Sequence, residues 1–373
     1  MPQLVMLPWP SAACRRRLPP QYSEPRANDT IVSRYEDALA IDAGAMRAMS
    51  GEGFDVVYMW VDDRWPGYAD EVGRYAQNTH DRNPNRTRDN LETLKFSLRS
   101  LELYAPWRRN VHVVTCRPQC PAWLDRGHPA LRIVHHDEIM PADILPTFNS
   151  FAIQSCLHEI PGLSRRFVCF DDDMLLLGPT SVDDFVGSDG RIRYDFAGRL
   201  PHRAPRRASP WNAALANNAA LLDKIDPRGR HPGFAHGPKM FDTSDCAELI
   251  QRWSAAFQRT RCSRFRAHDN IAMEALLPQY LVARGRASAV GTAATRRRAT
   301  YLGLENIEPW NRFWLWRIER SGIRFLTLND NFGPDPNQLA VRNARRKLEA
   351  LFPAASAYEI GARSEPTSVK TRS

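Results

Sequence analysis

The sequence predicts an α/β fold: a Rossmann-like, mostly parallel sheet with covering helices and a helical and loop-rich insertion. Short apolar runs, rich in β-branched and aromatic residues, alternate with amphipathic stretches, as strands and helices do in parallel sheets. Three of these runs end in Asp or Asn. Polar residues of this kind are expected where strands reach the ligand-binding edge of an open sheet.

The length allows one large domain or two ordinary ones, because 373 residues with 43% hydrophobic residues can bury a sizeable core. We expect a loosely packed lead-in over residues 1–50 and a folded domain over 51–335 that holds the functional site. Residues 199–320 would be the helical and loop-rich part that completes this site. A short helix and a frayed tail would follow over 336–373.

The charge and the cysteine content indicate which ligands and which cellular compartment to expect. The net charge is +9, and only five of the 51 basic residues are lysines. An excess of Arg suits phosphate binding, although a genome rich in G and C explains it equally well. The seven Cys form no CxxC pair, which indicates buried thiols in a reducing compartment. No apolar run approaches the roughly 18 residues that span a bilayer, so we expect a cytoplasmic protein.

The first half of the folded part reads as alternating strands and helices. A core strand at residues 54–63 leads into a polar stretch at 64–88, which is long for a loop and indicates a functional or mobile one. Asp89 is a plausible N-cap for an amphipathic helix that ends near Pro106. Further strands are expected at 111–115, 131–134 and 167–170, and a helix at 151–159.

The pattern loosens after Leu177. Helices are expected at 211–224, 245–258 and 269–281, and loops at 199–210 and 226–244. Residues 323–328 read as the last core strand, which ends in Asn329 and Asp330. A final helix is expected at 336–352.

The centre of the predicted site is the stretch 166–177, RFVCFDDDMLLL. An apolar strand runs into Asp171, Asp172 and Asp173, and a second apolar run follows. Three adjacent carboxylates in such a place repel one another unless a cation or a donor-rich ligand lies there. The alternative is a helix N-terminus with an acidic first turn, which needs only one or two of the three.

Acidic residues also end two other predicted strands, with Asp62 and Asp63 at one and Asn329 and Asp330 at the other. Three such strand ends predict a shared site at one edge of a sheet. Oxygen ligands suit Mg²⁺ or Mn²⁺, which take one or two carboxylates and let substrate phosphates complete their shell. The thiolate and three-histidine patterns of zinc sites are missing from the sequence.

Basic side chains near these acids are candidates for binding phosphate. Arg88 precedes a helix start, where backbone N–H groups favour anions. Arg264 and Arg266 bracket Phe265, so in an extended segment they would face the same side and could fork onto a phosphate. For each arginine, a salt bridge to a nearby Asp is the alternative. His236 is a candidate general base, with a polar surface histidine as the alternative.

Several common motifs are missing from the sequence, namely GxxxxGK[ST], GxGxxG after a strand, and GxSxG. One basic run is left over. The three arginines at 296–298, with Trp310, Trp314 and Trp316 nearby, would suit a nucleic acid, an anionic membrane or a polyanionic glycan. A solvated charged loop is the simplest interpretation.

Four blocks of sequence, in order, carry a family resemblance. They are residues 55–62 (DVVYMWVD); Arg88-Asp89-Asn90 with 145–150 (LPTFNS) and 171–174 (DDDM); His236-Gly237-Pro238 with Arg264-Phe265-Arg266 and Asp269; and 328–331 (LNDN). Together they resemble the Stealth family of sugar-phosphate transferases. That family builds bacterial capsule polymers and includes the catalytic subunit of the animal N-acetylglucosamine-1-phosphotransferase.

The resemblance implies that a hexose-1-phosphate passes from a nucleotide-diphosphate sugar to a sugar hydroxyl, as in capsule or cell-wall polysaccharide synthesis. A phosphodiester forms and a nucleoside monophosphate leaves. The residues implied in catalysis are His236, Asp172, Arg264, Arg266 and Asp269. Those implied in substrate binding are Asp62, Arg88, Asp89, Asn90, Asn149 and Asn329. The implied ligands of Mg²⁺ or Mn²⁺ are Asp172, Asp173 and Asp330.

The chain departs from the family pattern at three positions. Asp171 stands where Asn is usual, so we expect it to tolerate substitution by Asn. Asp63 stands where Gly is usual. In the block after His236, Phe241 is expected to fill the role of a later aromatic residue.

Two other functions stay open at this point. A nucleotide-sugar-dependent glycosyltransferase would share the glycosyltransferase-A-like sheet but release a nucleoside diphosphate. A basic glycan- or nucleic-acid-binding protein would need no divalent cation, but it leaves the acidic strand ends unexplained. The expected partners are a nucleotide-sugar donor and a glycan acceptor, and not a nucleic acid. The positive charge permits peripheral contact with the inner face of a membrane.

Overall fold

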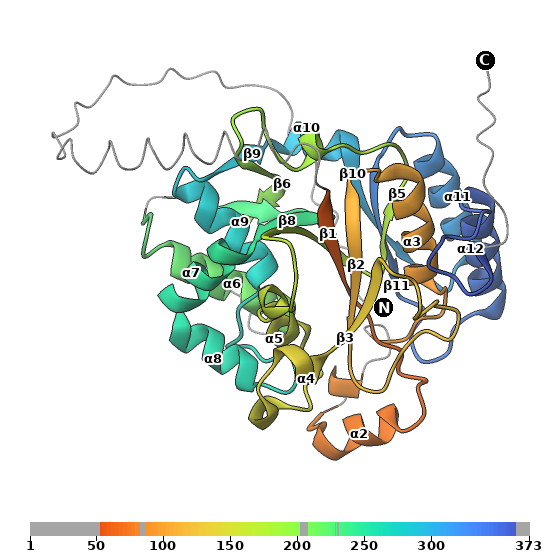
Figure 1. Ribbon diagram of the computed structural model, residues 1–373, viewed down its shortest axis with the longest axis horizontal. Coiled ribbons are helices and arrows are strands. Elements are labelled where there is room, and N and C mark those ends of the chain that lie inside the picture. The colour runs from red at the N-terminus through yellow and green to blue at the C-terminus, as the bar shows by residue number, and fades with distance from the viewer. Residues whose placement is uncertain are drawn as a thin grey trace, which may run out of the picture. The chain divides into compact units, whose positions relative to one another are not determined.

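The computed structural model describes residues 53–78, 80–82, 87–201, 208–227, 229 and 231–362. The predicted lead-in over residues 1–50 and the last part of the predicted tail lie outside the described residues. The described part is built from three sheets with helices packed on both sides of the largest one (Figure 1).

The main sheet has the strand order β3-β2-β1-β4-β8. Its strands are β1 (Phe54–Met59), β2 (Arg108–Thr115), β3 (Leu131–His135), β4 (Arg166–Asp171) and β8 (Lys239–Asp242). The first four are parallel, and β8 runs antiparallel to β4 at one edge. The order 3-2-1-4 is that of Rossmann-type sheets, so the predicted α/β fold with a mostly parallel sheet is confirmed.

Two smaller sheets complete the fold. One has the order β10-β11-β5, formed by β10 (Ala299–Leu304), β11 (Phe325–Asp330) and β5 (Met174–Leu176). The other has the order β7-β6-β9, formed by β6 (Ile192–Arg199), β7 (Pro232–Phe234) and β9 (Ala287–Val290). The predicted last core strand therefore exists as β11, but it belongs to the second sheet.

Helices lie on both sides of the main sheet. On one side Figure 1 shows α5 (Ser150–Gln154), α6 (Pro210–Leu222), α7 (Thr243–Arg252), α8 (Ser254–Cys262) and α9 (Met273–Ala283). On the other it shows α3 (Thr93–Tyr104), α11 (Glu308–Glu319) and α12 (Gln338–Leu351). The shorter helices are α2 (Tyr68–Tyr75), α4 (His136–Ile139) and α10 (Thr292–Arg298).

Helix α3 joins the two hydrophobic cores of the described part. Leu94, Leu98 and Leu101 pack into the core of the main sheet, whereas Phe96 packs into the core of the second sheet. The three leucines, four and three residues apart, form the apolar face that packs on the first core, and Phe96 extends to the second core from another face of the helix. In the described part of the chain, no helix is both long and apolar enough to cross a membrane.

Several element predictions are wrong in detail. The supposed loop at 64–88 contains α2 and a 3₁₀ turn over His80–Arg82. The supposed loop at 226–244 contains β7 and β8, the second of which is fully buried. The helix predicted at 245–258 is divided at Trp253 into α7 and α8, and the helix predicted from Asp269 begins at Met273.

The predicted fraying from residue 353 is also wrong as far as residue 362. Tyr358 and Glu359 are buried there. Arg99 of α3 donates from Nε and Nη2 to the two carboxylate oxygens of Glu359, each at 2.7 Å. The segment after α12 is thus anchored to α3 by a charged hydrogen-bonded pair.

Candidate active site

The carboxyl ends of the main-sheet strands open onto a cavity of about 400 Å³. Met59 at the end of β1 pairs in register with Asp171 of β4 on one side and with Val114 of β2 on the other, and all three line the cavity. This is the edge at which open α/β sheets bind ligands.

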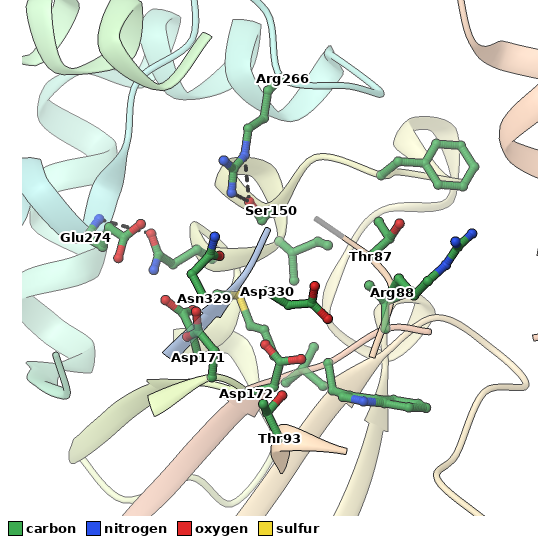
Figure 2. A pocket seen from close by; sticks show the side chains of 18 of the residues that line it. Thr87, Arg88, Thr93, Ser150, Asp171, Asp172, Arg266, Glu274, Asn329 and Asp330 are labelled. Atoms are coloured by element: carbon green, nitrogen blue, oxygen red, sulfur yellow. Dashed lines mark hydrogen bonds between the residues drawn. The ribbon is translucent and has the colours of Figure 1, made fainter. Parts of the chain in front are cut away.

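A second acidic strand end reaches the same cavity from the second sheet. The Leu328 N–H donates to the Asp173 carbonyl at 2.8 Å, which ties the end of β11 to the turn after β4. Asn329 and Asp330 then lie close to Asp172 in the cavity wall (Figure 2). The structure therefore brings together two of the three acidic strand ends that the sequence singles out.

The surroundings of the adjacent carboxylates Asp171, Asp172 and Asp173 disfavour their negative charge and raise all three pKa values. Burial, followed by the charges of neighbouring carboxylates, raises the pKa of Asp172 well above its usual range and that of Asp173 to about 8. The pKa of Asp171 is raised by burial, against the opposing effect of Lys239 and Arg266. The carboxylate Oδ1 of Asp173 is buried and has no hydrogen-bond partner among the described residues.

A cation would relieve this repulsion, and oxygen-rich sites of this kind suit Mg²⁺ or Mn²⁺. In the part of the chain that the structure describes, no three His, Cys, Asp or Glu side chains are arranged to hold a metal by themselves. Further ligands would have to come from a bound molecule, as substrate phosphates do in many Mg²⁺ sites.

Asp330 and Asn90 form a supporting pair. Asn90 Nδ2 donates to Asp330 Oδ2 at 2.8 Å, and the Phe332 N–H donates to Asp330 Oδ1 at 3.0 Å. Asp330 lines the cavity, whereas Asn90 does not. Asn90 therefore acts on the site through Asp330.

Arg266 is a positioned cation on the cavity wall. Its Nε donates to Ser150 Oγ at 2.9 Å, its Nη2 bonds the same oxygen, and its guanidinium lies 4.4 Å from the centre of the Phe151 ring. Figure 2 shows this pairing above the carboxylates. A guanidinium fixed in this way is prepared to bind phosphate through its fork.

Asn149 fixes the loop that carries Arg266. Its Nδ2 lies within hydrogen-bond distance of the carbonyl oxygens of Ser263 and Phe265, at 2.9 and 3.3 Å, and donates to Asn270 Oδ1 at 2.8 Å. Its Oδ1 accepts the Phe151 N–H at the start of α5. The predicted substrate-binding residue is fully buried and does not line the cavity, so its effect on the site is positional.

Arg264 and Asp269 also lie outside the cavity lining. Residues 264 and 265 form a bend, and not the extended segment that the sequence suggested. Arg264 Nη1 donates to the Pro146 carbonyl at 2.6 Å, and its guanidinium lies 4.7 Å from the Tyr75 ring centre. Asp269 is exposed. Only Arg266 of the predicted pair reaches the cavity.

Of the predicted site residues near the end of β1, Arg88 alone lines the cavity. Arg88 lines the cavity and donates to both carboxylate oxygens of Asp63, at 3.0 and 3.2 Å. Asp62 accepts from Arg64, and the buried Asp89 accepts from Trp60 Nε1 at 3.2 Å. The salt bridge considered as the alternative for Arg88 is present, and neither Asp62 nor Asp89 lines the cavity.

His236 lies in the loop between β7 and β8, with its ring between two other aromatic rings. The ring centres of Trp211 and Tyr301 are 5.8 and 5.2 Å away. Burial, and then the positive charges of Lys239 and Arg266, lower the pKa of His236 to about 4. The imidazole is therefore neutral at pH 7 and able to accept a proton.

The sequence analysis did not predict Glu274 as a site residue, although it lines the cavity together with Gln154 and Trp211. Glu274 stands in the first turn of α9, where its N–H donates to Gln154 Oε1 at 3.0 Å. Burial and the charge of Asp171 raise the pKa of Glu274 to about 7. A sequence signal existed, because Glu274 is the single charge in the apolar run 271–283.

The run of arginines at 296–298 is not one uniform patch. Arg298 Nη1 lies 3.1 Å from Asp184 Oδ1, and its Nε lies 2.9 Å from Asp195 Oδ1. Arg296 and Arg297 are exposed on α10. The third arginine of the run therefore serves the fold.

Two family models match regions of the chain that contain several of these site residues. Stealth protein CR2, conserved region 2, matches residues 86–194, and Stealth protein CR3, conserved region 3, matches residues 235–283. The chain belongs to the Stealth family. The first Stealth region contains the carboxylates that follow β4, and the second contains His236, Arg266 and Glu274.

The Stealth relatives are named as polysaccharide phosphotransferases. Exopolysaccharide phosphotransferase SCO6023 of Streptomyces coelicolor is 35% identical over 314 residues, which cover 82% of this chain and 52% of the relative. Capsular polysaccharide phosphotransferase SacB of Neisseria meningitidis serogroup A is 32% identical over 322 residues, with coverages of 82% and 56%. The chain thus spans about half the length of the curated relatives it matches.

The solved structures that match the chain include galactosyltransferase LgtC in complex with donor and acceptor sugar analogues. It is 12% identical, covers 80% of this Stealth chain and 96% of its own, and gives a TM-score of 0.39. Mouse xyloside xylosyltransferase 1 in its apo form is 11% identical, with coverages of 74% and 97% and a TM-score of 0.34.

Proposed function

We propose that this Stealth protein transfers a sugar-1-phosphate from a nucleotide-diphosphate sugar to a hydroxyl group of a glycan. The observation that carries the proposal is the cavity itself, which is lined by the carboxylates at the ends of β4 and β11 together with Arg266 and a neutral His236. The names of the relatives, exopolysaccharide and capsular polysaccharide phosphotransferase, support the same reaction class.

In this reaction the acceptor hydroxyl oxygen attacks the phosphorus that carries the sugar. The bond from that phosphorus to the bridging oxygen breaks, and the nucleoside monophosphate leaves with this oxygen. A phosphodiester between the two sugars is formed. The hydroxyl proton passes to an imidazole nitrogen of His236, and the Arg266 fork holds charge that builds on the phosphoryl oxygens.

Asp172 and Asp173 would hold a Mg²⁺ or Mn²⁺ ion, with Asp330 completing the acidic wall. The residues fit such an ion, because Asp173 Oδ1 is buried without a hydrogen-bond partner among the described residues and the adjacent carboxylates repel one another. When bound, the ion supplies positive charge that neutralises the diphosphate.

The released nucleotide tests the proposal. The protein is incubated with Mg²⁺, a panel of UDP-, GDP- and ADP-hexoses and simple glycosides, and the products are identified by mass spectrometry. We expect a nucleoside monophosphate and a phosphodiester in equal amounts, and no turnover with EDTA. Release of a nucleoside diphosphate would instead make the protein a glycosyltransferase.

Variants of the acidic wall and the base test the assignment of roles. Asp172→Asn and His236→Asn are each expected to lower kcat by about 10²-fold or more, since charge stabilisation and proton transfer are each worth that much. Asp189→Asn, at an exposed position, and His128→Asn, at a half-buried one, serve as matched controls because neither residue lines the cavity. Near-normal turnover in both site variants would contradict the assignment.

A further inference from the structure

The cavity has two ends of different chemistry. Figure 2 shows Thr87 and Arg88 on one side of Asp172 and Asp330, and Glu274 on the other. Lining residues beside the first end come from the ends of β1 and β2 and from the start of α4: Trp60, Cys116 and His136. Lining residues beside the other end are Gln154, Trp211, His236 and Tyr301. The acidic wall separates the two ends.

The strand order suggests which end receives which part of a nucleotide sugar. In Rossmann-type sheets the nucleotide lies over the carboxyl ends of the strands, beside the point where the strand order reverses. Here that point lies between β1 and β4, so the Arg88 end, over β1 to β3, suits the nucleoside. The diphosphate would then lie at the acidic wall, and the sugar would reach the Glu274 end.

The Glu274 end has the composition of a sugar-binding pocket. The rings of Trp211, His236 and Tyr301 follow one another, and Tyr301 remains 48% exposed. Aromatic faces pack well against the C–H face of a sugar ring, and a few polar groups then fix its orientation. The Glu274 carboxylate is such a group.

Glu274 is unusual in its helix. From Ile271 to Leu281 every residue is buried except Glu274, which borders the cavity. Behind it lies Lys239, only 8% exposed, whose Nζ donates to the Gly237 carbonyl at 2.9 Å and which interacts electrostatically with Glu274 and Asp171. A carboxylate buried beside a lysine and open to a cavity is able to accept hydrogen bonds from a ligand.

We propose that Glu274 is a specificity-determining residue that binds hydroxyl groups of the donor sugar, while Trp211 and Tyr301 pack against the sugar ring. This inference rests on the proposed function, because it assumes a nucleotide-sugar donor. A carboxylate accepts hydrogen bonds from two neighbouring hydroxyls, so Glu274 would select among sugars by the placement of those hydroxyls.

The test compares the affinity for a nucleotide sugar with that for the bare nucleotide. Dissociation constants of UDP, UDP-N-acetylglucosamine, GDP and GDP-mannose are measured by calorimetry with Mg²⁺. In wild type, we expect at least one sugar conjugate to bind more tightly than its nucleotide. Glu274→Gln should weaken that conjugate by about 10- to 100-fold, the usual effect of losing a charged hydrogen bond, and leave the nucleotide unchanged.

Glu308→Gln is the matched control. Glu308 occupies the first turn of α11, as Glu274 does in α9, but it does not line the cavity. All four dissociation constants should keep their wild-type values in this variant. Thermal unfolding shows whether Glu274→Gln remains folded. If it does not, Trp211→Ala replaces it, with the same selective loss expected.

Each result has a distinct meaning. Equal weakening of a nucleotide and its sugar conjugate by Glu274→Gln would overturn the inference, since the residue would then act on the shared part of the ligand. Equal affinities of each nucleotide and its conjugate in wild type would also overturn it. If wild type binds none of the four probes, the proposed function fails together with the inference. If wild type binds a probe but Glu274→Gln shows no selective loss, the inference alone fails.

Discussion

His236 shows how single side chains prepare this site for chemistry. Its ring lies between Trp211 and Tyr301, and Lys239 and Arg266 lie near enough to oppose a positive charge on it. A solvent-exposed histidine would be about 90% protonated at pH 5.5. With its pKa lowered to about 4, His236 stays neutral there.

This charge state predicts the acidic side of the pH profile. If His236 is the base, kcat/KM should fall as the pH drops through about 4, and not through 6.5, because only the neutral imidazole accepts a proton. The measurement is kcat/KM from pH 3.5 to 8 with saturating Mg²⁺. His236→Asn should lack this limb in its residual activity. Glu274, with a pKa of about 7, titrates in the same range, so an inflection near pH 6.5 would assign the proton transfer to another group only if it persists in Glu274→Gln.

At the scale of elements, the loop between α8 and α9 delivers Arg266 to the cavity and is fastened to the start of α5. One side-chain amide does most of this fastening, because Asn149 Nδ2 reaches carbonyl oxygens of the loop and Asn270 Oδ1. Within this loop, residues 264 and 265 form a bend. Arg264 consequently stacks on Tyr75 outside the cavity.

Asn149→Asp tests the fastening. An aspartate cannot donate to these oxygens and brings a negative charge to them, so we expect about 1–3 kcal/mol lower stability. We also expect at least about tenfold lower kcat/KM, because Arg266 loses its fixed position. Urea unfolding and steady-state kinetics measure the two effects. Asn78→Asp, at an exposed asparagine whose Oδ1 accepts a backbone N–H, should change neither.

Elements that are buried on both sides were the ones that the sequence predicted well. Strands β1 and β4 are mostly apolar, with the buried Asp55 as the one charge inside them, because helices cover both faces of the sheet. Strand β8 escaped prediction because it has only four residues, begins with Lys239 and follows a loop rich in glycine. Local motifs indicated Asp172, Asp330 and His236, but which side chains reach the cavity depends on bends and tertiary contacts that spacing does not encode.

At the scale of the whole domain, the second sheet and the segment after α12 are held against the main sheet through α3. Burial alone would raise the pKa of Glu359, but hydrogen bonds from Arg99 and the Ser356 N–H lower it overall. Glu359 is only 6% exposed, and its carboxylate forms ion pairs with both Arg99 and Lys95. This pair links the end of the described chain to its first half.

Glu359→Gln should lower the stability by about 3 kcal/mol, because it leaves the Arg99 guanidinium buried without its partner. In the wild-type protein, the stabilisation that the Glu359 carboxylate provides should also be lost in acid. The folded carboxylate has a lowered pKa, so its stabilisation is present above the unfolded value near 4.5 and disappears as the pH falls below that. Thermal unfolding at pH 7 and pH 3.5 measures both. The exposed Glu349→Gln should match wild type.

The hydrogen bond between Leu328 and Asp173 has a consequence for the order in which the protein is made. The main sheet through β4 leaves the ribosome long before β11 does, since 155 residues separate the two partners of this bond. Until β11 arrives, the nascent chain has no Asn329 or Asp330 to close the cavity. A chain that stops early during translation would therefore carry three unscreened carboxylates and no complete pocket for a charged substrate.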